Sequence, residues 1–414
     1  MKIFGQHDEQ TVIQFQDVRT RAVDAALMAD GHVGYVMPIG GVAAYRDQVS
    51  VVGVGFDIAC GNAAIRTDLT LDALGQSPAE ARRTLAAFAN EIADTVSFGI
   101  GRKNRSGDAP VDHPLFADPS WDVVPPKHRQ ALQVKARQQL GTVGSGNHYV
   151  DVFSDETGTL WVGVHFGSRG FGHTVASAFL AVGQGKAWGE RVPEREVLLD
   201  LDAPMGEAYW ALMSLAGRYA YAGREWVARK VLSILGAREV DLVHNHHNFA
   251  WKEQHGGRDF IVIRKGATPA FPGQRGFIGG SMGDDAVIVE GTRPVDASGD
   301  VVRPDVVQRQ KEALFSTVHG AGRVMSRTQA AGKRKWGRGN KVISPGRVSP
   351  EMMHEWVKRK GVILRGGGLD ESPHVYRRLP DVLAAQQDTI TILHTLRPLI
   401  VAMAGPDEFD PYKD

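Results

Sequence analysis

Cysteine is almost absent from this sequence of 414 residues, in which Cys60 is the only one. No internal disulfide can form, which indicates a reducing compartment. Long hydrophobic runs are missing too, since the apolar run near the C-terminus, Leu399 to Ala404, is far too short to cross a bilayer. The N-terminus has no apolar signal-peptide core. The sequence therefore predicts a cytoplasmic protein with no membrane segment.

A charge excess of one sign is also absent, because 48 Lys and Arg residues balance 47 Asp and Glu residues. Affinity for nucleic acid would therefore come from a local patch. Acidic residues are missing altogether from Ala313 to Pro350. The basic residues of this strip, with Trp336 among them, are Arg323, Arg327, Lys333, Arg334, Lys335, Arg338, Lys341 and Arg347. Such a strip can neutralise phosphates and stack a base, although an ordinary solvated surface is the alternative.

Repeats and low-complexity linkers are absent, so we expect one compact domain over residues 1–414. Apolar patterns predict strands over residues 33–39, 51–54, 149–153, 160–164, 240–243, 260–263 and 286–289. Helices are predicted from Pro78 (after a capping box that begins at Ser77) to Ala93, and over residues 130–139, 205–235, 350–360 and 381–396. Gly217 and Gly223 could divide the longest helix in two. Because these elements follow no regular βαβ rhythm, the predicted fold class is α+β, a mixed α/β arrangement.

Residues able to bind a metal gather in glycine-rich segments next to apolar runs. The first segment holds Asp57 and Cys60, and the second ends in Asn147 and His148. The other metal-binding candidates are His165, followed by Arg169 and His173, and the cluster His244, His246 and His247. Each residue alone is more often structural, but their shared setting favours one metal site built from distant loops. Carboxylate, thiolate and imidazole together suit Zn²⁺, Mn²⁺ or Co²⁺, and the residues do not choose among them.

A candidate nucleophile, His319, lies in the stretch Ser316–Arg327, where Gly320 and Gly322 permit close approach of a ligand. Two arginines of this stretch could bind phosphate, and the imidazole could attack a phosphorus centre. The alternative is a glycine-rich turn with a solvated histidine. The glycine-rich segments 264–268 and 277–283 could bind phosphate or a base edge, but neither is a Walker A loop.

Taken together, these motifs resemble the RtcB family of GTP-dependent RNA-splicing ligases. The segments that carry the resemblance are 28–32, 37–41, 53–61, 144–148, 165–173, 246–248, 264–267, 280–283, 319–327 and 370–376. They occur in the family's order and cover most of the chain. The resemblance implies a single large domain in which β-sheets line a central metal-containing cleft, with Pro406–Asp414 as a C-terminal extension.

The implied enzyme is a GTP- and Mn²⁺-dependent ligase that joins an RNA 2′,3′-cyclic phosphate or 3′-phosphate end to a 5′-hydroxyl end, in tRNA splicing or RNA repair. GMP would pass from GTP to the catalytic His319, then to the RNA 3′ end, and the 5′-hydroxyl would finally displace it. An archease-type activator is a possible partner, and a monomer is expected.

The resemblance also assigns roles to particular residues. Two Mn²⁺ ions, replaceable by Zn²⁺ or Co²⁺, would be held by Asp57, Cys60, His148, His165 and His247, with Cys60 bridging. His247 is preferred because it precedes Asn248, while His244 and His246 stay open. The implied nucleotide contacts are Asn147, Asp151, Asn248, Ser281, His319, Gly320, Ala321, Gly322 and Tyr376. The implied RNA contacts are Arg169, Arg323 and Arg327.

Three positions depart from the family's pattern. Asp151 stands where the family usually has glutamate, and Ala286 where serine is common. The lysine expected just before the last glycine is missing, because Ala404 precedes Gly405. Since that lysine contacts guanine in the family, the nucleotide preference is open. One alternative is therefore a paralogue acting mainly as a metal-dependent 2′,3′-cyclic phosphodiesterase or phosphatase, and another is a non-enzymatic RNA-binding protein.

Overall fold

The computed structural model describes residues 2–296, 299–335, 341–406 and 408. Its α-helices are α1 (Glu9–Arg19), α2 (Val51–Val54), α3 (Pro78–Thr95), α4 (Pro126–Gln139), α5 (Arg169–Gly183), α6 (Pro204–Leu235), α7 (Pro304–Glu312), α8 (Arg327–Ala331), α9 (Pro350–Arg359) and α10 (Leu379–Ala385). Short 3₁₀ turns cover Leu71–Leu74, Pro114–Ala117, Pro119–Val123, Leu369–Glu371 and Pro373–Val375. In the part of the chain so described, no helix has both the length and the apolar character needed to span a membrane.

The strands in the first half of the chain are β1 (Lys2–Ile3), β2 (Asp24–His32), β3 (Ile39–Tyr45), β4 (Gln48–Ser50), β5 (Gly61–Thr70), β6 (Tyr149–Ser154), β7 (Thr159–Phe166) and β8 (Leu198–Asp200). Those in the second half are β9 (Glu239–His246), β10 (Asn248–His255), β11 (Arg258–Lys265), β12 (Ala267–Pro269), β13 (Arg275–Ile278), β14 (Ala286–Gly291), β15 (Ser316–Val318), β16 (Lys333–Lys335), β17 (Lys341–Ser344), β18 (Ile363–Arg365) and β19 (Ile390–Met403).

Two large sheets organise the described residues. An eight-stranded sheet has the order β13-β14-β19-β6-β7-β5-β9, with β18 paired to β19. A five-stranded sheet has the order β1-β2-β3-β11-β10, and three two-stranded pairs complete the pattern. About half of the pairings join strands that follow one another in sequence, and the others, such as β5 with β9 and β6 with β19, join distant parts of the chain. This confirms the predicted mixed α/β fold class.

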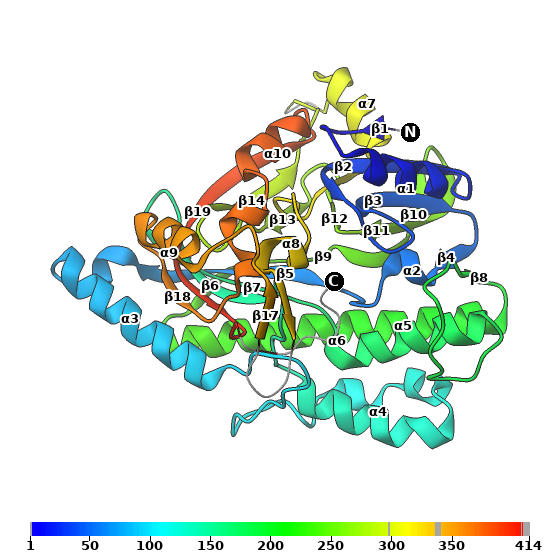
Figure 1. The fold of residues 1–414 in the computed structure, drawn as a ribbon. Helices are drawn as coiled ribbons and strands as arrows, with labels where there is room; N and C mark the ends of the chain where they lie inside the picture. The colour runs from blue at the N-terminus through cyan, green and yellow to red at the C-terminus, as the bar shows by residue number, and fades with distance from the viewer. Residues whose placement is uncertain (1, 297–298, 336–340, 407, 409–414) are drawn as a thin grey trace.

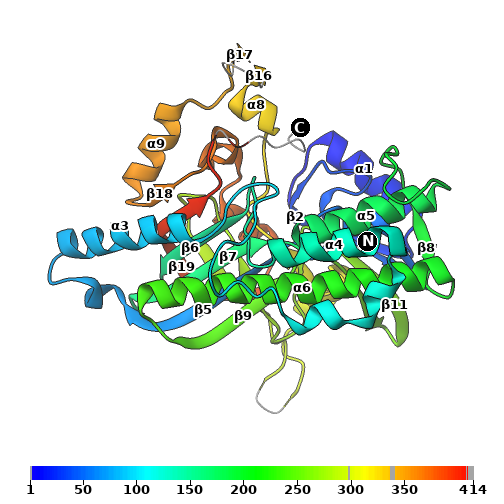
Figure 2. The same cartoon turned by 90° about the horizontal axis from the view of Figure 1, so that it is seen from below.

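Helices cover the sheets on one side of the molecule. The long helix α6 packs on β5 and β7, and α4, α5 and α6 lie side by side (Figures 1 and 2). Buried residues such as Phe171, Leu212 and Ile263 form the core around α5 and α6. A second core, which includes Val162 and Val231, lies between the larger sheet, α3 and α6. The candidate metal ligands lie at the adjoining ends of β5, β6, β7 and β9, either within the strand, as His165 does, or in the loop beside it.

Several helices form where the sequence predicts them. Ser77 caps α3 by accepting a hydrogen bond from the Glu80 amide, and Ser349 caps α9 in the same way. The helix predicted over residues 205–235 is unbroken. Gly217 lies inside the helix and does not divide it. A Cβ at this position would lie 2.9 Å from the Phe249 ring. This glycine permits close packing instead of ending the helix.

Three predicted elements are wrong. Residues 33–38 form bends and irregular backbone, with Val36 at a φ of 61°, and only Ile39 begins a strand. Residues 51–54 form the short helix α2, because Ser50 accepts a hydrogen bond from the Gly53 amide. The helix predicted over residues 381–396 ends at Ala385 and is followed by β19, which pairs with β14 and β6.

Candidate functional site

The candidate metal ligands meet because of the strand register in the larger sheet. Gly61, at the start of β5, pairs with Phe166 of β7 and with His246 of β9. Cys60, His165 and His247, which are the neighbours of these residues in the sequence, therefore come together in space. The candidate ligands form two overlapping groups, Asp57–Cys60–His148 and Cys60–His165–His247, in each of which the ligand atoms lie within 4.8 Å of one another. Cys60 belongs to both groups.

The distances within the cluster are short. The Cys60 Sγ atom lies 3.6 Å from His148 Nε2 and 3.5 Å from His165 Nε2. His148 Nε2 is 3.0 Å from Asp57 Oδ2, and the rings of His165 and His247 stack with centroids 5.1 Å apart. A Cβ at Gly167 would lie 2.1 Å from Asp57 Oδ1. Glycine at position 167 is therefore required for Asp57 to reach the cluster.

The protonation states of this cluster fit a divalent cation. Burial, followed by the charges of neighbouring imidazoles, lowers the pKa of His165 and His247, so both rings are neutral and can bind a metal. Burial alone would raise the pKa of Asp57, but the hydrogen bond and charge of His148 outweigh it and bring this pKa below its usual range. Burial and the charge of Asp57 raise the pKa of the Cys60 thiol. A bound cation would take the Cys60 thiolate as a ligand and would thereby offset the effect of burial and of Asp57 on this pKa.

Asn62 orients one of the candidate ligands. Its Oδ1 atom lies 2.5 Å from His165 Nδ1, and its amide nitrogen donates to the Phe277 carbonyl. The imidazole therefore donates its Nδ1 proton to Asn62 and directs its Nε2 lone pair toward Cys60. Such a partner fixes both the ring and the tautomer of a metal-binding histidine.

His319 lies next to this cluster and is held by a buried carboxylate. Its ring centroid is 4.9 Å from that of His247. Asp30, which is completely buried, accepts a hydrogen bond of 2.6 Å from His319 Nδ1 and another of 3.0 Å from the His319 amide. Because Nδ1 is engaged, Nε2 is the ring nitrogen left to react. The side chain is 15% exposed, so a ligand can reach it.

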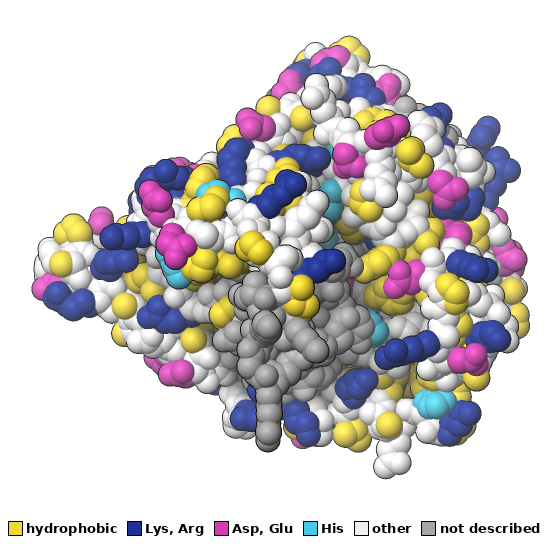
Figure 3. All heavy atoms as spheres, in the orientation of Figure 1, with side chains coloured by type: hydrophobic (Ala, Val, Ile, Leu, Met, Phe, Trp, Pro, Cys, Tyr) yellow, Lys and Arg dark blue, Asp and Glu magenta, His cyan; other side chains and the backbone are white. Residues whose placement is uncertain are grey.

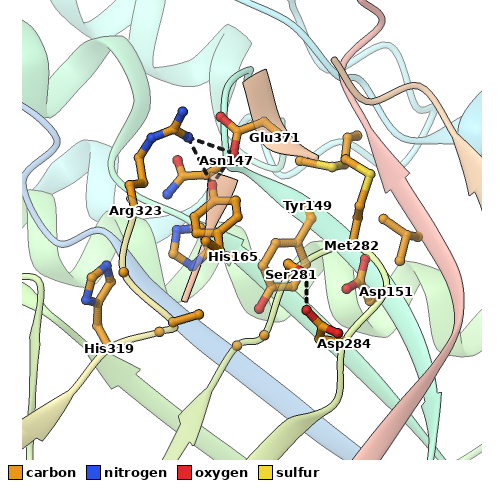
Figure 4. A pocket seen from close by; sticks show the side chains of 18 of the residues that line it. Asn147, Tyr149, Asp151, His165, Ser281, Met282, Asp284, His319, Arg323 and Glu371 are labelled. Atoms are coloured by element: carbon orange, nitrogen blue, oxygen red, sulfur yellow. Dashed lines mark hydrogen bonds and ion pairs between the residues drawn. The ribbon is translucent and has the colours of Figure 1, made fainter. Parts of the chain in front are cut away.

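A pocket opens beside His319 and leads away from it. The pocket contains about 800 Å³ of space, partly open to solvent. In Figure 4, His319 and Arg323 lie at one end, and Asp151, Met282 and Asp284 at the other, with Tyr149 and His165 between them. The Tyr149 hydroxyl and the Asp151 Oδ1 atom are buried and have no hydrogen-bond partner among the residues that the structure describes. These two groups offer polar contacts to a ligand.

The comparisons with known proteins identify the family. The model of a family described as tRNA-splicing ligase RtcB matches residues 12–404. This chain belongs to the RtcB family. It is 30% identical to the RNA-splicing ligase RtcB of Escherichia coli K12, over 91% of this chain and 88% of that protein. It is 31% identical to the tRNA-splicing ligase RtcB of Archaeoglobus fulgidus, over 92% and 87% of the two chains. It is 29% identical to the tRNA-splicing ligase RtcB of Thermococcus kodakarensis, over 91% of this chain and 86% of that protein.

Most residues to which the RtcB resemblance assigns a nucleotide contact line the pocket. They are Asn147, Asp151, Ser281, His319, Gly320, Ala321, Gly322 and Tyr376. Asn248 does not line it. Its side chain accepts a hydrogen bond from the Gly266 amide at 2.7 Å and lies 3.5 Å from the Asp57 carbonyl. Asn248 thus joins the loop of Asp57 to the strand end at Gly266.

The arginines assigned to RNA lie at different places in the RtcB site. Arg169 is beside the candidate metal ligands, with Nη1 3.2 Å from His148 Nδ1. Arg323 and Arg327 line the pocket, and both pair with Glu371, whose charge offsets theirs. Of the basic strip, Trp336 and Arg338 lie outside the described residues. On the face of the molecule shown in Figure 3, Lys and Arg side chains lie around a hollow in which histidine atoms are visible.

The three histidines of the 244–247 cluster have different surroundings. Only His247 belongs to a candidate metal group among the described residues. His244 and His246 accept hydrogen bonds from Arg224 at 2.8 and 2.9 Å. A β-strand alternates its side chains between two faces, but His246 and His247 straddle the end of β9, so simple alternation from the sequence could not assign them.

Sequence reasoning gave no role to Asp30, Asn62 or Tyr149. Asp30 is a buried carboxylate in the apolar strand β2, a pattern that signals a polar partner elsewhere in the chain. Tyr149 stacks on His165, with ring centroids 5.3 Å apart. Two of the departures from the RtcB pattern, Ala286 and Ala404, do not line the pocket, although Met403 next to Ala404 does. Ala286 is buried in β14, and Ala404 bonds through its carbonyl to the Gly367 amide.

Proposed function

We propose that this protein is an RNA ligase that joins a 2′,3′-cyclic phosphate or 3′-phosphate end to a 5′-hydroxyl end, using GTP and two Mn²⁺ ions. One observation carries the proposal. The imidazole of His319, oriented by Asp30, lines a pocket, and its ring centroid lies 4.9 Å from that of His247, which belongs to one of the two overlapping donor groups that share Cys60. Membership of the RtcB family supports the same function.

His319 would transfer GMP through its Nε2 atom. This nitrogen forms a bond to the α-phosphorus of GTP, the bond from that phosphorus to the bridging oxygen breaks, and pyrophosphate leaves. Asp30 accepts the Nδ1 proton in a hydrogen bond of 2.6 Å and stabilises the positive charge that the ring gains. An oxygen of the RNA 3′-phosphate then attacks the same phosphorus and displaces the imidazole.

The second half of the reaction seals the strands. Water first attacks the phosphorus of the cyclic end and the bond from phosphorus to O2′ breaks, which leaves a 3′-phosphate and a 2′-hydroxyl. GMP then activates the 3′-phosphate, because the phosphate alone has no good leaving group. The 5′-hydroxyl loses its proton, attacks the activated 3′-phosphate and releases GMP. The metal pair, when bound through Asp57, Cys60, His148, His165 and His247, supplies positive charge that offsets the charge of the phosphates.

The pocket suits a nucleoside at its far end. Asp151 at this end and Tyr149 in the middle of the pocket present a carboxylate oxygen and a hydroxyl that have no hydrogen-bond partner among the described residues, and Ser281 donates to Asp284 at 2.7 Å. Burial raises the pKa of Asp151 well above its usual value, so a donor from the ligand is needed for its ionised form. Such donors occur on the amino and imino edge of guanine. Support for GTP over other nucleotides rests on this pairing.

The proposal is tested by joining two short RNAs in the presence of Mn²⁺ and GTP. One RNA carries a 2′,3′-cyclic phosphate or a 3′-phosphate, and the control RNA carries a 3′-hydroxyl. Joined product is expected with both phosphorylated ends, none with the control RNA, and none with His319→Ala. Opening of the cyclic end without joining, equal in wild type and His319→Ala, would show instead that the protein is a phosphodiesterase.

A further inference from the structure

Arg224 is a buried arginine of α6 whose guanidinium donates hydrogen bonds mainly to residues next to the candidate metal ligands. Its side chain is completely buried. Nη1 donates to the carbonyls of Ala59 and Phe166 at 2.9 and 2.6 Å. Nη2 donates to His246 Nδ1 at 2.9 Å, and Nε to His244 Nε2 at 2.8 Å. A single guanidinium therefore binds four acceptors on three separate segments of the chain.

Three of these four acceptors are immediate neighbours of candidate metal ligands. Ala59 precedes Cys60, Phe166 follows His165, and His246 precedes His247. These three ligands are the complete second metal group. Arg224 thus contacts the backbone or side chain next to every member of that group. Within the described residues, no carboxylate pairs with its guanidinium, so the contacts serve geometry more than charge neutralisation.

The two histidines that Arg224 contacts, His244 and His246, accept its hydrogen bonds and so fix the guanidinium in place. A guanidinium can only donate hydrogen bonds, so His244 Nε2 and His246 Nδ1 must be acceptors. The Tyr221 ring stacks on His246 with centroids 3.9 Å apart, and Glu225 lies 3.6 Å from His244 Nδ1. Tyr221 and Glu225 thereby fix the imidazole acceptors, which accounts for His244 and His246 remaining outside the metal groups.

We propose that Arg224 is a positioning residue that sets the relative placement of Cys60, His165 and His247 for a divalent metal. This inference rests on the metal use in the proposed function and goes beyond it, because Arg224 donates to no candidate ligand atom and does not line the pocket. Its planar fork can meet four acceptors at once, whereas the single ammonium of a lysine cannot. Removing it leaves the Ala59 and Phe166 carbonyls without this partner and allows the three segments to shift.

The test is a titration of the metal-free full-length protein with Co²⁺, which reports thiolate ligation and coordination geometry through its absorption spectrum. The variants are Arg224→Met and Arg224→Lys. The matched control is Arg264→Lys, because Arg264 is equally buried but donates to Glu253, Ser316 and the Leu314 carbonyl, none of which is a candidate metal ligand or its sequence neighbour. We expect Arg224→Met to lose about 10- to 100-fold in Co²⁺ affinity, and Arg224→Lys to lose less. We also expect both to have altered spectra, and Arg264→Lys to keep the wild-type spectrum and affinity.

Unfolding midpoints of all variants are measured in parallel without metal. A folded Arg224→Met protein with wild-type affinity and spectrum would overturn the proposal. If Arg224→Met does not fold, Arg224→Lys decides: an unchanged spectrum overturns the proposal, and a change absent from Arg264→Lys supports it. A wild-type protein that shows no thiolate–cobalt absorption would instead refute the metal site, and with it the metal part of the proposed function.

Discussion

Replacing Asp30 by asparagine isolates the contribution of its negative charge to the chemistry of His319. The carboxylate accepts hydrogen bonds from His319 Nδ1 at 2.6 Å, from the His319 amide at 3.0 Å and from the Gly320 amide at 3.3 Å. Asparagine keeps the shape and one acceptor oxygen. It removes the charge that stabilises the ring once Nε2 has bound phosphorus.

The size of the effect follows from the hydrogen bond to the charged ring. A hydrogen bond to a charged group contributes about 1.5–3 kcal/mol. Since about 1.4 kcal/mol corresponds to a factor of ten, we expect GMP transfer to His319 to slow by about 10- to 150-fold. The Michaelis constant for GTP should change little, because Asp30 is covered by the loop and does not line the pocket.

The assay is a single-turnover measurement of covalent GMP transfer at saturating GTP and Mn²⁺. Asp155→Asn is the matched control, since Asp155 is also buried and accepts hydrogen bonds from two backbone amides and from Trp161. It lies in the loop after β6, away from His319, so its variant should transfer GMP at the wild-type rate. The reasoning about Asp30 would be refuted if a folded Asp30→Asn protein did the same.

The remaining predictions concern backbone space, a buried ion pair and pH. Gly322→Ala should abolish GMP transfer, because its Cβ would meet a backbone oxygen at 2.3 Å, whereas Gly361→Ala, at a similar φ with open space around it, should lose only about 1–2 kcal/mol of unfolding free energy in urea. Glu253→Ala should lower the unfolding free energy by about 3–5 kcal/mol, since it leaves the buried Arg264 without its carboxylate, and a loss below 1 kcal/mol would contradict this. Burial raises the pKa of Asp155, but hydrogen bonds from Trp161 and Thr157 outweigh it and lower this pKa overall. Its contribution to stability is therefore present above the unfolded pKa of about 3.9 and lost as pH falls through the folded value, so wild type and Asp155→Asn should converge in unfolding free energy at low pH.

Local sequence signals were sufficient to predict some of the helices and to select the candidate metal ligands. Ser77 and Ser349 are side-chain caps whose effect is confined to one turn, so α3 and α9 could be predicted from the sequence. The candidate metal ligands could be chosen from the sequence because each cysteine, aspartate or histidine stands next to an apolar run and close to a glycine. The structure brings five of them together at the ends of three paired strands and the loops beside them.

One error of fold, and the missed roles of Asp30 and Arg224, arise where distant partners decide the structure, whereas the error at residues 51–54 is local and comes from the cap at Ser50. Residues 390–396 have an apolar pattern compatible with a helix, but the edge of β14 recruits them into β19. The roles of Asp30 and Arg224 depend on residues that lie 289 and as many as 165 positions away. A buried charge in an apolar element indicates that such a partner exists. It does not say which residue that partner is.

The central claim is that His319 forms a covalent bond to GMP beside the metal cluster. Intact-mass measurement of the full-length protein after incubation with Mn²⁺ and GTP tests it, with acid treatment as a check because a bond from phosphorus to imidazole nitrogen is acid-labile. The account predicts a gain of one GMP, lost in acid, mapped to the peptide that contains His319 and absent from His319→Ala. Wild-type protein that gains no GMP, or gains it equally in His319→Ala, would contradict the account.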